Sequence, residues 1–105
     1  MGLTCTGGDR EICMALSGEV DHHHARGLMT EIEREIDREL PKHVTLDLGG
    51  VTFMDSSGIG LILGRVRLLQ FWRGRVVVAG LSPHLDRMVE LSGIGSIAAI
   101  ERRAG

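Results

Sequence analysis

The sequence is poor in aromatic side chains: Phe, Trp and Tyr together make up 3% of its 105 residues, which leaves no stacking surface for bases or sugars. Its net charge of −2 and lack of a long basic run argue against nucleic acid as a partner. No apolar run approaches membrane-spanning length, because Asp55 and Arg65 bracket the most apolar segment. The N-terminus lacks the charged start and apolar core of a secretory signal. We therefore expect a single cytoplasmic domain over residues 1–105, with no membrane partner.

Cysteine is also scarce. Cys5 and Cys13 are the two cysteines, and they lack the partner spacing of a metal site. They could face each other across a hairpin, but a reduced pair is the expectation for a cytoplasmic protein.

The N-terminal third has the pattern of a β-hairpin followed by a helix. Residues 3–6 form a short strand, 7–9 are a turn signal, and residues 11–17 alternate between apolar and other side chains, as in a strand with one buried face. Residues 18–21 are expected to leave the sheet, with Asp21 as the N-cap of a helix.

Apolar residues recur every three or four positions from Ala25 to Leu40, which predicts an amphipathic helix that Pro41 ends. A buried-type strand follows at 43–48. Residues 49–54 then lead through a turn to a second apolar helix at 57–72.

The C-terminal third predicts a short parallel strand at 76–79 and a helix that starts at Ser82-Pro83 and stops at Gly93. A last strand is expected at 96–101, and residues 102–105 are expected to be a frayed tail. The resulting order, β-β-α-β-α-β-α-β, predicts an α/β fold. It should be one mixed, mostly parallel sheet with the helices packed on one face.

The most informative stretch is the junction between the strand and turn predicted at 43–54 and the helix predicted at 57–72. There Asp55 precedes Ser56 and Ser57, where the first N–H groups of the helix have no partner within the helix. Such a helix start suits a phosphate group. The plainer interpretation is that one serine caps the helix by accepting an N–H bond, and Asp55 could orient the Ser56 hydroxyl or cap the turn.

Catalytic and cofactor motifs are incomplete. Met54 stands where a Gly-x-Ser-x-Gly nucleophile elbow around Ser56 needs glycine. The run from His22 to His24 has no carboxylate or cysteine cluster to complete a metal site, so solvated residues at a helix entry are expected there. Gly58 and Gly60 lack the third glycine of a dinucleotide fingerprint, and no phosphate-loop lysine is present. We expect no catalytic residues, no metal and no cofactor.

The stretch from Phe53 to Arg65, with Asp-Ser-Ser-Gly at its junction, closely resembles the signature of the STAS-domain anti-sigma factor antagonists. The resemblance extends to residues 16–23, 44–48 and 82–93, and so covers nearly the whole chain in the same order of elements. It is closest to the sporulation branch of the family, which acts on sigma-F. It departs from the family in the glycine-rich segment 48–51 and in the short end after the last strand.

The resemblance implies a phosphorylation switch rather than an enzyme. In the family, the serine directly after the aspartate, here Ser56, is phosphorylated by the anti-sigma factor, a serine kinase that uses ATP. The unphosphorylated form binds that kinase and releases the sigma factor, and a serine phosphatase resets the switch. The alternatives are a nucleotide-binding or weakly hydrolysing STAS protein, or a STAS module of another signalling complex. The residues expected at the partner surface are Glu19, Asp21, Asp55, Ser57 and Gly58.

Overall fold

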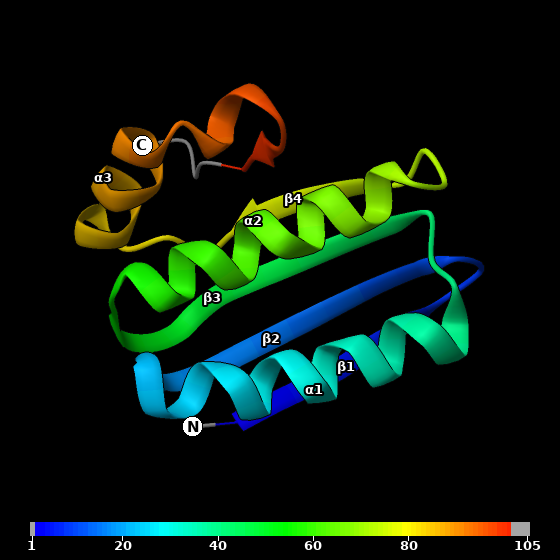
Figure 1. The fold of residues 1–105 in the computed structure, drawn as a ribbon, viewed down its shortest axis with the longest axis horizontal. Coiled ribbons are helices and arrows are strands. Elements are labelled where there is room, and N and C mark those ends of the chain that lie inside the picture. The colour runs from blue at the N-terminus through cyan, green and yellow to red at the C-terminus, as the bar shows by residue number, and fades with distance from the viewer. Residues whose placement is uncertain (1, 102–105) are drawn as a thin grey trace.

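The computed structural model describes residues 2–101, which form a five-stranded sheet with three α-helices (Figure 1). The order of the elements is the one that the sequence predicts. The predicted tail at 102–105 lies outside the described residues. The elements are β1 (Gly2–Gly8), β2 (Glu11–Val20), α1 (His22–Glu39), β3 (His43–Met54), α2 (Ser56–Gln70), β4 (Arg75–Ala79), α3 (Pro83–Ser92), the 3₁₀ turn η1 (Ile94–Ser96) and β5 (Ala99–Ile100).

The strands lie in the sheet in their chain order, β1-β2-β3-β4-β5. β1 is antiparallel to β2, and the other neighbouring pairs are parallel. Each parallel pair is joined by a helix, as a crossover between parallel strands requires. The sheet is therefore mixed and mostly parallel, as the sequence predicts.

Helices α1 and α2 lie side by side on one face of the sheet, and α3 packs next to α2 (Figure 1). The core lies between these helices and the strands, because alternate strand residues point toward the helices. Arg65 of α2 is also buried, and its guanidinium lies 2.9 Å from the Glu33 carboxylate of α1. Completely buried core side chains are Met14, Leu28, Ile32, Ile36, Val44, Leu46, Leu69, Val78 and Val89.

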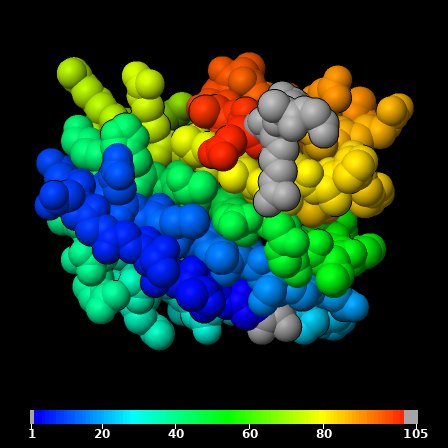
Figure 2. Space-filling model, turned by 180° about the vertical axis from the view of Figure 1, so that it is seen from behind, coloured from blue at the N-terminus to red at the C-terminus, as the bar shows by residue number. Residues whose placement is uncertain are grey.

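The opposite face of the sheet carries small side chains, among them the register partners Cys13, Thr45 and Val77. Figure 2 looks at this face and shows residues of β1, β2 and β3 at the surface across the middle of the view. Side chains along these strands therefore point alternately to the core and to solvent, which is the pattern predicted for residues 11–17.

The hairpin turn lies later than predicted. β1 runs through Gly8, and the turn consists of Asp9 and Arg10, with φ of 44° and 68°. Positive φ at both central residues is the requirement of a two-residue type I′ hairpin, whose twist suits the flanking strands. Cys5 lies opposite Met14, and Cys13 lies opposite Thr6, so the two cysteines project from opposite faces and both are free.

Strands β2 and β3 continue past their predicted ends at residues 17 and 48. Residues 18–21 were expected to leave the sheet, but residues 18–20 remain in β2 and Asp21 leaves it. The turn expected at 49–54 was also wrong, because β2 pairs with β3 as far as Val20 and Met54. Register shifts between Ala15 and Ser17 and after Gly18 break the alternation of side chains without ending the pairing. Gly18 has a φ of 84°, which a residue with a side chain rarely adopts.

Other boundaries differ by a few residues. Asp21 is the N-cap of α1 as predicted, and the helix begins directly after it. The last strand is shorter than the predicted 96–101, because η1 occupies 94–96 and the Ser96 hydroxyl donates to the Gly93 carbonyl. Ser82 caps α3, and Gly93 ends it with a φ of 80°, both as predicted.

Candidate functional site

Two strand-to-helix junctions meet at the carboxyl end of the sheet. β2 ends at Val20 and Asp21 caps α1, while β3 ends at Met54 and Asp55 caps α2. Val20 and Met54 are register partners, and the Asp55 N–H donates to the Val20 carbonyl at 3.4 Å. The N-termini of α1 and α2 therefore lie next to each other, as Figure 1 shows. Both helix ends carry partial positive charge, so this edge of the sheet favours anions.

The Asp55 carboxylate holds both helix starts. Its Oδ1 accepts a hydrogen bond from the Ser57 N–H at 2.8 Å, and its Oδ2 accepts one from the His22 N–H at 3.2 Å. The first bond caps α2, and the second ties the first residue of α1 to the same carboxylate. The interpretation in which a serine caps α2 was therefore wrong, because the cap is Asp55.

Capping by Asp55 leaves Ser56 as the first residue of α2, and its side chain is exposed. Ser57 is half-buried, and its backbone N–H is the one that donates to Asp55. No acidic residue occupies the first turn of α2. A group attached to the Ser56 hydroxyl would consequently extend into solvent at a helix N-terminus.

Gly58 is buried where α2 rests on the end of β3. A Cβ at this position would overlap Cγ of Met54 and come within 3.3 Å of Cγ1 of Val20. Glycine is thus what allows the helix start to approach both strand ends. The participation of Gly58 in partner binding remains a prediction.

We expect Gly58→Ala to lower the free energy of unfolding by about 1–3 kcal/mol, because the new methyl group overpacks the contact with Met54. Urea unfolding monitored by circular dichroism measures the change. Gly60→Ala is the matched control, since Gly60 lies in the same helix and a methyl group there would meet no neighbouring side chain or strand within 4 Å. Gly60→Ala should instead raise the free energy of unfolding by up to about 1 kcal/mol, because alanine favours a helix more than glycine does. Equal effects at the two positions would contradict this account of Gly58.

Asp21 and Glu19 stand beside Asp55. Asp21 Oδ1 accepts from the His24 N–H at 3.0 Å and lies 2.7 Å from Nδ1 of the same histidine. Partial desolvation acts to raise the pKa of Asp21, but hydrogen bonds and charge attraction from His24 outweigh it and hold this pKa below its usual value. Glu19 is exposed and pairs in register with Phe53, whose side chain is 48% exposed. The predicted surface residues are thus brought to one edge of the molecule.

Carboxylates do lie close to the histidine run, contrary to the expectation from sequence. Glu19, Asp21 and His24 each offer one ligand atom within 4.8 Å of the others. Capping of α1 by Asp21 accounts for this grouping, so we assign no metal to it. His22 and His23 are exposed, and their rings make an edge contact with centroids 6.2 Å apart.

Two features of this edge were not predicted from the sequence: the His22 N–H bond to Asp55 and the exposed ring of Phe53. The repeated pattern of strand, aspartate and helix could have revealed the first, because consecutive parallel strands end at the same edge of a sheet.

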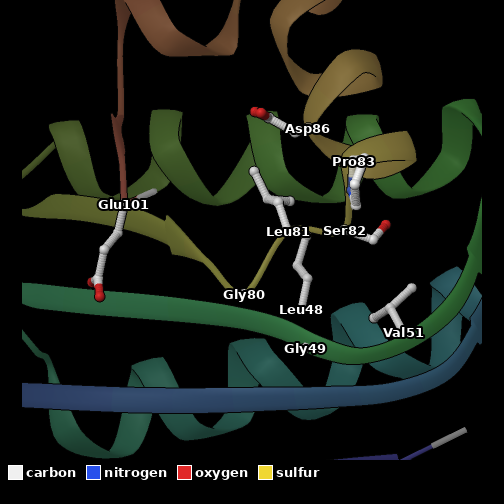
Figure 3. A pocket seen from close by; sticks show the side chains of 9 residues that line it. All are labelled: Leu48, Gly49, Val51, Gly80, Leu81, Ser82, Pro83, Asp86 and Glu101. Atoms are coloured by element: carbon white, nitrogen blue, oxygen red, sulfur yellow. The ribbon is translucent and has the colours of Figure 1, made fainter. Parts of the chain in front are cut away.

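An open cavity of about 500 Å³ lies between the second half of β3, the segment that follows β4 and the start of α3, and Ser56 is not among its lining residues (Figure 3). Its described lining includes the carboxylates Asp86 and Glu101 and carries no lysine or arginine. Such a lining repels phosphate groups, so this cavity gives no support to nucleotide binding.

Residues 3–103 match the family model of the STAS domain. The chain belongs to the STAS domain family. It is 36% identical over 89 residues to an anti-sigma F factor antagonist of Paenibacillus polymyxa, covering 85% of this chain and 76% of the relative. None of the described helices is both long and apolar enough to cross a membrane.

Two solved STAS structures have the same fold. The anti-sigma factor antagonist SpoIIAA in its unphosphorylated form has a TM-score of 0.81 at 28% identity, covering 97% of this chain and 90% of that one. The Bacillus cell fate determinant SpoIIAA in its phosphorylated form has a TM-score of 0.73 at 28% identity, covering 97% and 93%. The SpoIIAA-like STAS fold is thus the fold of this chain.

Proposed function

We propose that this STAS domain is an anti-sigma factor antagonist that phosphorylation of Ser56 switches off. In its unphosphorylated form it binds an anti-sigma factor that is also a serine kinase, and the sigma factor is released. A serine phosphatase restores the binding form. The chain has no catalytic role of its own in this scheme, and it acts in the cytoplasm, where sigma factors meet RNA polymerase.

The observation that carries the proposal is the exposed Ser56 at the first position of α2, in a chain similar to anti-sigma F factor antagonists. A kinase must reach the hydroxyl that it modifies, and this one lies outside the capping hydrogen bonds that Asp55 makes. SpoIIAA, which has the same fold, has been solved in a phosphorylated form, and this supports a phosphorylated state of the present chain.

The physics of the junction supports a switch without refolding. A phosphate adds about −1.5 to −2 charges at neutral pH, and the N-termini of α1 and α2 both favour negative charge nearby. The fold should therefore tolerate the modification. Across an interface the same group must lose water beside Glu19, Asp21 and Asp55, so binding weakens through desolvation and like-charge repulsion.

Phosphorylation by the cognate anti-sigma kinase with ATP tests the proposal directly. Tryptic mass spectrometry should place a single phosphate on Ser56. Ser57→Ala should be phosphorylated like the unmodified chain, whereas Ser56→Ala should not be phosphorylated. The two variants differ only in which of two neighbouring hydroxyls is lost, so a phosphate found on Ser57, or elsewhere, would contradict the assignment.

A further inference from the structure

β1 is an unprotected edge of the sheet. Among the described residues it pairs with β2 alone, and its register with β2 is continuous from Gly2 to Gly8. The strand contains no proline and no charged residue. Exposed edge strands are usually short, charged, interrupted by a bulge or covered, because their free N–H and C=O groups can pair with another chain. The opposite edge, β5, follows this rule with a length of two residues.

The helix beside this edge carries a stripe of alternating charge. An open groove of about 410 Å³ is lined by Leu3 and Cys5 of β1 and by Glu31, Arg34, Glu35 and Arg38 of α1. Burial is the main cause that raises the pKa of the Cys5 thiol, and the nearby Glu35 carboxylate raises it further. Cys5 therefore lies beneath the charged stripe, at the middle of β1 and beside the C-terminal half of α1.

This stripe is complementary to itself. A two-fold axis reverses the direction of a helix, so position 31 of one copy would face 38 of the other, and position 34 would face 35. Each of these pairs joins a glutamate to an arginine. The same axis, placed at Cys5, would bring two β1 strands together in the antiparallel direction.

We propose that β1 and the charged stripe of α1 form a docking surface for a second copy of this chain. Antiparallel β1–β1 pairing joins the two sheets into one continuous sheet through main-chain hydrogen bonds, and the stripe fixes the register. The site at Ser56 stays accessible, because α2 follows β3, two strands away from the β1 edge.

Sedimentation velocity of the purified chain, over a range of about 5 to 500 μM, should show a reversible dimer that weakens as salt is added. Glu31→Arg places two arginines opposite each other at both ends of the stripe and should raise the dissociation constant at least about tenfold. Glu31→Arg combined with Arg38→Glu restores opposite charges in every pair between the two copies and should recover part of the affinity, since it also removes the Glu35–Arg38 ion pair within each copy. Circular dichroism checks that each variant is folded.

Oxidative cross-linking tests the register. Residues directly opposite in an antiparallel pair have Cα atoms about 4.5–5.5 Å apart, which is within the range of a disulfide. Diamide should therefore join Cys5 of two copies: the two thiols lose two electrons and two protons, and the N=N bond of diamide is reduced to a hydrazine. Cys13→Ser should cross-link, and Cys5→Ser should not.

A chain that remains monomeric throughout the concentration range overturns the proposal. So does a dimer whose dissociation constant is unaffected by Glu31→Arg, or one that cross-links through Cys13. Cross-linking through Cys5, together with weakening by the single charge reversal and recovery by the exchanged pair, supports it.

Discussion

Replacing Ser56 with aspartate should weaken binding to the cognate anti-sigma factor by at least about a hundredfold, or roughly 2.7 kcal/mol. The hydroxyl is exposed at the first position of α2, and Glu19, Asp21 and Asp55 occupy the same edge. A fourth carboxylate at this edge must lose its water on binding and repels its neighbours. Isothermal titration calorimetry with the nucleotide-loaded anti-sigma factor measures the loss.

The same substitution should leave the fold intact, and this separates an effect on the interface from unfolding. A negative charge in the first turn of a helix is favourable by about 0.3–1 kcal/mol, so Ser56→Asp should unfold at a slightly higher urea concentration. Ser56→Ala is the uncharged control and should bind within a few-fold of the unmodified chain. Unchanged affinity for Ser56→Asp would refute the switch, and a loss of binding in Ser56→Ala would instead make the hydroxyl a contact of its own.

Asp55→Ala should lower the free energy of unfolding by about 2–3 kcal/mol, more than the loss of an ordinary helix cap. An N-cap replaced by alanine typically costs about 1 kcal/mol. Asp55 accepts bonds from both Ser57 and His22, so its removal leaves two N–H groups without their acceptor and takes a carboxylate away from two helix ends. Urea unfolding at neutral pH measures the change.

Asp55→Asn and Asp37→Ala set the limits of this effect. The asparagine keeps one oxygen for the Ser57 N–H but loses the second acceptor and the charge, so an intermediate loss is expected. Asp37 is an exposed acid on α1, and its replacement should change stability by less than about 0.5 kcal/mol. If Asp55→Ala behaves like Asp37→Ala, the shared cap contributes nothing to stability.

The elements that the sequence predicted well have local chemical causes. The apolar residues of α1 recur at helical spacing and give its buried stripe, and Asp21 before it is a strong N-cap. Ser82 and Pro83 likewise mark the start of α3, and Gly93 marks its end. Each of these signals acts within a few residues, so no knowledge of the rest of the fold is needed to interpret it.

The features that the sequence did not predict depend on contacts between distant segments. The ends of β2 and β3 were missed because the strands stay paired through bulges near Gly18. At the bulges the alternation of buried and exposed side chains is broken, so the sequence pattern no longer indicates a strand. The bond between His22 and Asp55 joins residues 33 positions apart and exists only in the register that pairs Val20 with Met54. Nothing in the local sequence of either residue specifies that register.

Sharing one carboxylate between two helices also makes the start of α1 and the start of α2 cooperative. The His22 N–H can reach Asp55 only when β2 and β3 have aligned their ends and the start of α2 holds the carboxylate in place, so displacement of Asp55 also releases the first residue of α1. Local opening at the start of α2 should therefore expose the amides of His22 and Ser57 in a single event. A kinase that pulls Ser56 out of the first turn would act on both helices at once.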